Sequence, residues 1–140
     1  MRLFLSVLLC SISLFTTAQK KEKIQILNAE EFRYSEKSKK DAQRLIGNVQ
    51  LKHQDVLMFC DSAYIYKEDN TVKAWGNIHI QEKDSIHAYS NILNYNGKTK
   101  TAELIGNARL KDGNKILYSD VLYYNIRQDV GSYLDSGRVE

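Results

Sequence analysis

Apolar and polar residues alternate along much of the chain after the first twenty-three positions. In one such stretch, Asn48 and Gln50 alternate with Val49 and Leu51. A period of two is typical of a β-strand with one buried face, whereas a helix needs a period of 3.6 over ten or more residues. No helical period follows the N-terminal apolar run. The pattern therefore predicts an all-β fold.

The alternating pattern is repeated. Gly-Asn pairs begin at Gly47, Gly76 and Gly106, and a further glycine, Gly137, continues the series at spacings of 29, 30 and 31 residues. Each unit then carries a polar turn residue, an aromatic residue, an Asp or Asn and two apolar residues, with one extra residue in the second unit. A repeat of this length indicates one supersecondary unit that stacks on its neighbours. We interpret each unit as two antiparallel strands, and residues 24–46 as a degenerate first unit.

Glycine inside a strand pattern indicates a bulge or a close backbone approach. We therefore expect the chain to bend at each Gly-Asn pair and continue as a strand. Turn residues separate the strands, at 67–70, 96–98, 111–114 and 126–129. Asn96-Gly97 is the strongest hairpin signal because both residues tolerate positive φ. The charged segment 35–43 is expected to be a solvated turn.

The first eighteen residues have the features of a cleaved signal peptide. Arg2 precedes an apolar run, Leu3–Phe15, and small residues end at Ala18. The run is too short for a membrane anchor. A lipoprotein would use Cys10 but needs a small residue before it, where Leu9 stands. We expect cleavage after Ala18 and export to the periplasm, either free or in association with the outer membrane. One domain is expected at 19–140, which is either complete or the opening part of a longer protein.

Composition argues against several functions. Twenty basic residues less Arg2 leave 19, against 17 acidic residues, so the mature chain carries a formal charge of +2 and gives no case for nucleic acid. Cys60 is then the only cysteine, so no intrachain disulfide can form. Its column holds serines in the other units, which favours a small strand residue over a nucleophile. Lysines at 20, 21, 23, 37, 39 and 40 are interpreted as solvated, with attraction to lipid phosphates as the alternative.

No catalytic or metal constellation is evident, and neither an enzyme nor a cofactor is expected. Asp61 and Asp120 occupy one repeat column whose third member is Asn91, which favours a ladder or turn partner over acid–base catalysis. His79 and His87 could meet across a hairpin, but His79 alternates with core positions. It is therefore predicted to lie on the outer face.

The motifs GNV.L, CDSA and A..L.GNA.L, behind an export signal, resemble the OstA-like family of periplasmic lipopolysaccharide-transport proteins, in a form most similar to Bacteroidetes versions. The resemblance covers residues 24–140. It implies a folded-over, twisted β-jellyroll that holds lipid A acyl chains in an apolar groove. It also implies stacking through exposed edge strands, with other transport components or head-to-tail with further copies. A structural β-repeat module with a closed core and no lipid remains the alternative.

The residues expected to line the interior and contact lipid come from the alternating apolar and aromatic columns. They are Val49, Leu51, Phe59, Ile78, Ile80, Tyr89, Leu93, Leu110, Tyr118 and Leu122. Tyr89 and Tyr118 are placed near the mouth of the groove because a tyrosine carries a polar tip. Ordinary core packing is the competing interpretation for each of them.

Overall fold

The computed structural model describes residues 22–35, 42–133 and 138–139. The predicted signal peptide, most of the charged segment and Gly137 lie outside the described residues. In the described residues ten strands form one sheet, and β3 to β8 pair antiparallel with their neighbours in chain order. The strands are β1 (Gln25–Asn28), β2 (Glu31–Ser35), β3 (Ala42–His53), β4 (Val56–Tyr66), β5 (Thr71–Glu82), β6 (Ile86–Asn96), β7 (Thr101–Asp112), β8 (Lys115–Asn125), β9 (Val130–Tyr133) and β10 (Arg138–Val139).

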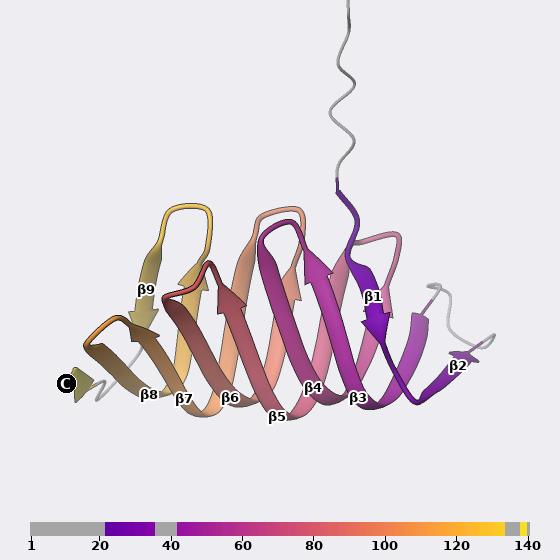
Figure 1. The fold of residues 1–140 in the computed structure, drawn as a ribbon, viewed down its shortest axis with the longest axis horizontal. Helices are drawn as coiled ribbons and strands as arrows, with labels where there is room; N and C mark the ends of the chain where they lie inside the picture. The colour runs from indigo at the N-terminus through magenta and orange to yellow at the C-terminus, as the bar shows by residue number, and fades with distance from the viewer. Residues whose placement is uncertain (1–21, 36–41, 134–137, 140) are drawn as a thin grey trace, which may run out of the picture.

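The sheet folds over on itself, as Figure 1 shows. Each long strand runs through the fold line at the bottom of the view and crosses from one layer to the other. We call layer A the part made of β1, residues 49–60, 78–90 and 108–119, and β10. Layer B contains β2, residues 42–46, 62–75, 92–105 and 121–125, and β9. The predicted all-β jellyroll is confirmed.

The fold line is made by bulges at the Gly-Asn pairs. Gly76 (φ +78) and Asn77 (φ +48) both adopt the left-handed conformation, and the register of β5 against β6 shifts between Trp75 and Ile78. Asn77 Nδ2 donates to Asp61 Oδ2 over 2.9 Å. Asp61 covers Gly76 so closely that a Cβ there would collide with its carboxylate. The predicted bend is confirmed, and Asp61 is a bend partner.

A side chain also covers the glycine at the other two Gly-Asn pairs. Glu30 covers Gly47 and accepts a hydrogen bond from Asn48 Nδ2 over 2.6 Å, while Asn91 covers Gly106. The polar column that contains Asp61 and Asn91 is therefore explained by the bends. Glu30 and Asp61 each accept a hydrogen bond from the asparagine of a Gly-Asn pair, and Asn91 packs over the third glycine.

The prediction of a tight hairpin at Asn96-Gly97 is wrong. The turn spans residues 97–100, and its positive φ lies at Lys100 (φ 54). Asn96 ends β6 and its side-chain oxygen accepts from Lys98 N over 2.9 Å, which is an Asx turn. Gly97 instead donates its backbone N–H to Asn70 O over 2.8 Å, because a neighbouring turn packs against it. Tertiary packing of adjacent turns selects the longer loop.

Candidate functional site

The interior between the two layers holds the hydrophobic core of the described residues. Layer A contributes two rows of cross-strand neighbours to this interior. The row nearer the fold line contains Val49, Cys60, Ile78, Ser90 and Ala108. The second row contains Leu51, Met58, Ile80, Ala88, Leu110 and Leu117. Layer B supplies Leu45, Ala63, Ala74, Leu93, Leu104 and Leu122 from the opposite side. Nearly all these side chains are buried. The sequence folds this way because alternation gives each strand one apolar face.

The structure separates the ten predicted interior residues into two groups. Seven lie in the interior rows: Val49, Leu51, Ile78, Ile80, Leu93, Leu110 and Leu122. Leu110 is half-buried and the other six are buried. Phe59, Tyr89 and Tyr118 instead lie on the outer face, so their interior placement is wrong.

The parity of the strands explains this error. Met58, Cys60, Ala88 and Ser90 are buried, and each flanks an outward-facing aromatic residue. The prediction followed the repeat columns, which do not show on which face of its strand the aromatic column lies. In this sheet the inward positions beside the aromatic residues hold smaller residues, which suit a narrow space between two layers.

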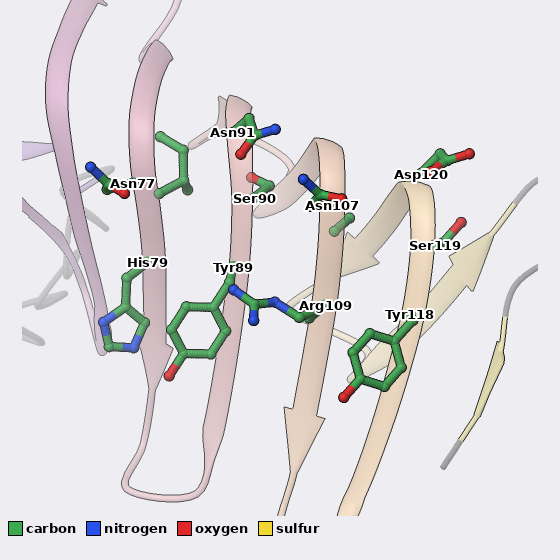
Figure 2. Close-up of a pocket in the computed structure, with 12 residues that line it drawn as sticks. Asn77, His79, Tyr89, Ser90, Asn91, Asn107, Arg109, Tyr118, Ser119 and Asp120 are labelled. Atoms are coloured by element: carbon green, nitrogen blue, oxygen red, sulfur yellow. The ribbon is translucent and has the colours of Figure 1, made fainter.

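The outward aromatic residues form a ladder across layer A. His79 stacks on Phe59 at 5.5 Å and on Tyr89 at 4.7 Å between ring centroids, and the Arg109 guanidinium lies 5.0 Å from the Tyr89 ring. Figure 2 shows His79, Tyr89, Arg109 and Tyr118 side by side on four successive strands. They border an outer groove of about 860 Å³. Because the ring faces of His79 and Tyr89 cover one another, the ladder stabilises the sheet surface and offers few free faces to a ligand.

His79 and His87 meet across the β5–β6 hairpin, as the sequence suggested. Their Nε2 and Nδ1 atoms are 2.9 Å apart, and burial and the neighbouring imidazole lower the pKa of His79. Among the described residues, no group of three or more potential metal ligands gathers. Burial also raises the pKa of the Cys60 thiol to about 12, which keeps it protonated and unreactive.

Two polar pairs cross the interior from layer B to layer A. Tyr124 on β8 donates to Glu82 Oε2 on β5 over 2.8 Å. Tyr95 on β6 and His53 Nδ1 on β3 are 2.6 Å apart. Burial is the main cause that raises the pKa of both tyrosines and lowers that of His53. The sequence did not predict these pairs, although Glu82 follows His53 by one repeat and Tyr124 follows Tyr95 by one repeat.

The edge opposite the fold line opens between the turns of the two layers. A cavity of about 640 Å³ lies there, lined by His53 and Gln54 of layer A, by turns of layer B and by Glu22 and Lys23. Its lining includes the cations Lys67, Lys98 and Arg127. The backbone at residues 22–24 crosses this edge, since His53 Nε2 contacts Glu22 O over 3.0 Å and Ile24 N donates to Asn70 Oδ1 over 3.1 Å. Side chains and this short segment therefore join the layers at the edge.

These features define a class of protein: a repetitive folded-over antiparallel sheet with a continuous apolar interior and one edge that no strand of the described residues crosses. The model of the OstA-like protein family matches residues 21–140, and the chain belongs to that family. A crystal structure of LptH from Pseudomonas aeruginosa is similar, with a TM-score of 0.73 at 12% identity over 86% of this chain and 94% of that chain. LptH is described as the LptA-homologous periplasmic component of the conserved lipopolysaccharide transport device. No curated protein sequence matches this chain.

Proposed function

We propose that this protein is a periplasmic lipid carrier of lipopolysaccharide transport, which holds lipid A acyl chains between its two layers. Membership of the OstA-like family supports the proposal. The observation that carries it is the interior itself, where apolar side chains of two layers face each other along the whole sheet. Transport then needs binding and release of a lipid, without a reaction at any of the residues described above.

Physical chemistry makes the interior suitable for acyl chains. Burial of each acyl CH₂ contributes roughly 0.8 kcal/mol. The interior side chains already pack against each other, so acyl chains must replace contacts between the layers. For lipid to enter, the layers would separate at the edge opposite the fold line, where side chains and residues 22–24, but no strand of the described residues, join them. Cations at this edge, among them Lys67, Lys98 and Arg127, would face the lipid phosphates.

Site-specific photocrosslinking tests the proposal. A photoreactive amino acid at Leu93 lies in the interior, and one at Asn94 lies one residue further on the outer face of the same strand. In cells that make lipopolysaccharide, we expect the Leu93 variant to form a lipopolysaccharide adduct and the Asn94 variant to form little or none. Ile80 and Gln81 give a second inner and outer pair on β5. Equal labelling at inner and outer positions would contradict acyl-chain binding inside the fold.

Native mass spectrometry of periplasmic protein separates this proposal from the alternative. A bound species with the mass of lipid A is expected for a carrier. Protein that stays bare after lipopolysaccharide is added would favour a structural β-repeat module with a closed core. Recovery of the mature chain beginning at residue 19 would at the same time test the proposed signal cleavage after Ala18.

The edge strands are proposed to join this carrier to its partners. β1 and β2 form one edge of the sheet, and β9 and β10 form the other. Unpaired backbone N–H and C=O groups on such edges are templates for strand addition. The partners proposed are other lipopolysaccharide-transport components of similar fold and further copies of this chain, stacked head to tail. Concentration-dependent association in sedimentation experiments would support the self-association.

A further inference from the structure

The two cross-layer polar pairs follow one rule of position. Tyr95 lies three strands after His53, counting β3 to β6, and Tyr124 lies three strands after Glu82, counting β5 to β8. Both pairs are separated by 42 residues. Because Glu22 O can only accept, His53 Nε2 carries the proton and Nδ1 accepts from Tyr95. A layer-B tyrosine therefore donates to a layer-A acceptor three strands earlier.

The third acceptor of this series is Asp112. His53, Glu82 and Asp112 lie in one row of layer A through the pairs His53↔Val56, Val56↔Glu82, Glu82↔Ile86 and Ile86↔Asp112. His53 and Glu82 are buried, whereas Asp112 is exposed at the end of β7. β9 and β10 both pair with β8 and together occupy the second strand position beyond β7. By the same rule, the tyrosine that would meet Asp112 belongs on the next strand position, three beyond β7.

The third tyrosine of the series is Tyr34, at the other end of the sheet. Tyr34 pairs with Gln43 on β3, in the row that contains Tyr95 and Tyr124. Its side chain is 72% exposed, since the strand three positions earlier does not exist within the described part of the chain. Figure 1 shows β2 at one end of the molecule and the β7–β8 turn near the other.

The ends are also complementary in apolar surface. Phe32 pairs with Leu45 and so faces the interior side, yet it is 51% exposed. At the far end, Leu110 and Leu117 pack against the core but are only half-buried, and Gly131 of β9 lies close to both from layer B. The two layers are staggered along the sheet, so at each end one layer extends beyond the other. The opposite end of another copy would cover the inner face of that extension.

We propose that Tyr34 of one copy donates its hydroxyl to Asp112 of the preceding copy, and that this contact fixes the register of a head-to-tail stack. If the edge β1–β2 of one copy adds to the edge β9–β10 of the preceding copy, β2 takes the position three strands beyond that copy's β7. Tyr34 then meets Asp112 as Tyr124 meets Glu82, and Phe32 covers the exposed apolar end. This inference rests on the self-association proposed above, and adds the residues that select the alignment.

Sedimentation velocity of purified mature protein tests the contact. Tyr34→Phe removes only the hydroxyl, and Asp112→Asn removes the charge. Each is expected to raise the dissociation constant of association about tenfold, the effect of losing one hydrogen bond to a charged group. Tyr123→Phe, on the outer face of β8, is the matched control and should leave association unchanged. Because Tyr34 and Asp112 are exposed, thermal unfolding of the dilute variants should match that of the wild type.

Mixing the two variants gives a sharper test. A Tyr34→Phe copy keeps Asp112 and an Asp112→Asn copy keeps Tyr34, so one junction between them is complete. The mixture should form mixed dimers with an affinity close to that of the wild type, although neither variant self-associates well. Wild-type association with no effect of Tyr34→Phe would overturn the contact alone. A wild-type chain that stays monomeric would overturn the stacking as well, and lipid binding would still be judged by crosslinking.

Discussion

Tyr124 and Glu82, 42 residues apart in the chain, meet in the interior with the tyrosine hydroxyl 2.8 Å from the carboxylate. The hydroxyl is the hydrogen-bond donor that compensates the carboxylate of Glu82, a residue with only 6% of its surface exposed. The contact ties layer B to layer A away from the fold line. Its strength therefore affects both the stability of the closed sheet and the free energy needed to separate the layers.

Tyr124→Phe should lower the free energy of unfolding by about 2 kcal/mol, because it leaves a buried carboxylate without its donor. Tyr95→Phe should cost less, about 1 kcal/mol, since the partner His53 is neutral. Chemical denaturation measures both, with Tyr123→Phe as the control for loss of an exposed hydroxyl. A Tyr124→Phe variant as stable as the control would contradict a structural role for the pair.

Gly76→Ala should destabilise the protein more than Gly113→Ala. Both glycines have positive φ, which costs an alanine about 1 kcal/mol. At Gly76 the new Cβ also collides with Asp61, whereas at Gly113 nothing lies within 4 Å. Thermal and urea unfolding should show a loss of about 1 kcal/mol for Gly113→Ala and clearly more for Gly76→Ala. Equal losses would mean that Asp61 moves aside freely and does not brace the bend.

Stability should fall as the pH is lowered from 7.5 to 5.5. Burial lowers the pKa of His53 in the folded protein below its ordinary value of 6.5, so the unfolded chain takes up the proton first. Stability is thus full above the unfolded pKa and is lost below it, with a slope of at most about 1.4 kcal/mol per pH unit for one group. His79 contributes in the same direction.

Unfolding titrations of His53→Gln at several pH values separate the two groups. The variant should be less stable at pH 7.5, because it loses the contacts with Tyr95 and Glu22. Its stability should also depend less on pH than that of the wild type. An unchanged pH slope would assign the effect to His79 or to other groups.

Gln43→Met should stabilise the protein by about 1 kcal/mol. Gln43 is buried in layer B and its side-chain oxygen has no hydrogen-bond partner in the described residues. A buried acceptor without a donor is destabilising, and methionine has a similar shape without that polar group. Denaturation midpoints of the variant and the wild type measure the effect. A loss of stability would indicate that Gln43 makes a contact that methionine cannot replace.

The local periodicity of the chain was sufficient to predict the strands, the repeat and the bends. Alternation at Val49 and Leu51 assigns one face to the core, and Gly76-Asn77 has the conformational freedom that a bend requires. These features depend on neighbours in sequence, so they can be recognised without coordinates. The family followed from the same columns of residues.

The tertiary structure decided which face each aromatic residue occupies and which polar groups meet. Phe59 and Tyr89 were predicted inside from their repeat column, but the phase of their strands places them outside. The pairing of Tyr124 with Glu82 depends on the stagger between two layers, and stagger is a property of how a sheet folds over. The sequence by itself determined the repeated, alternating strands, because strand patterns are local. Only the folded sheet determined the outer ladder, the cross-layer pairs and the unmatched ends, because these need strands that are distant in sequence to be brought together.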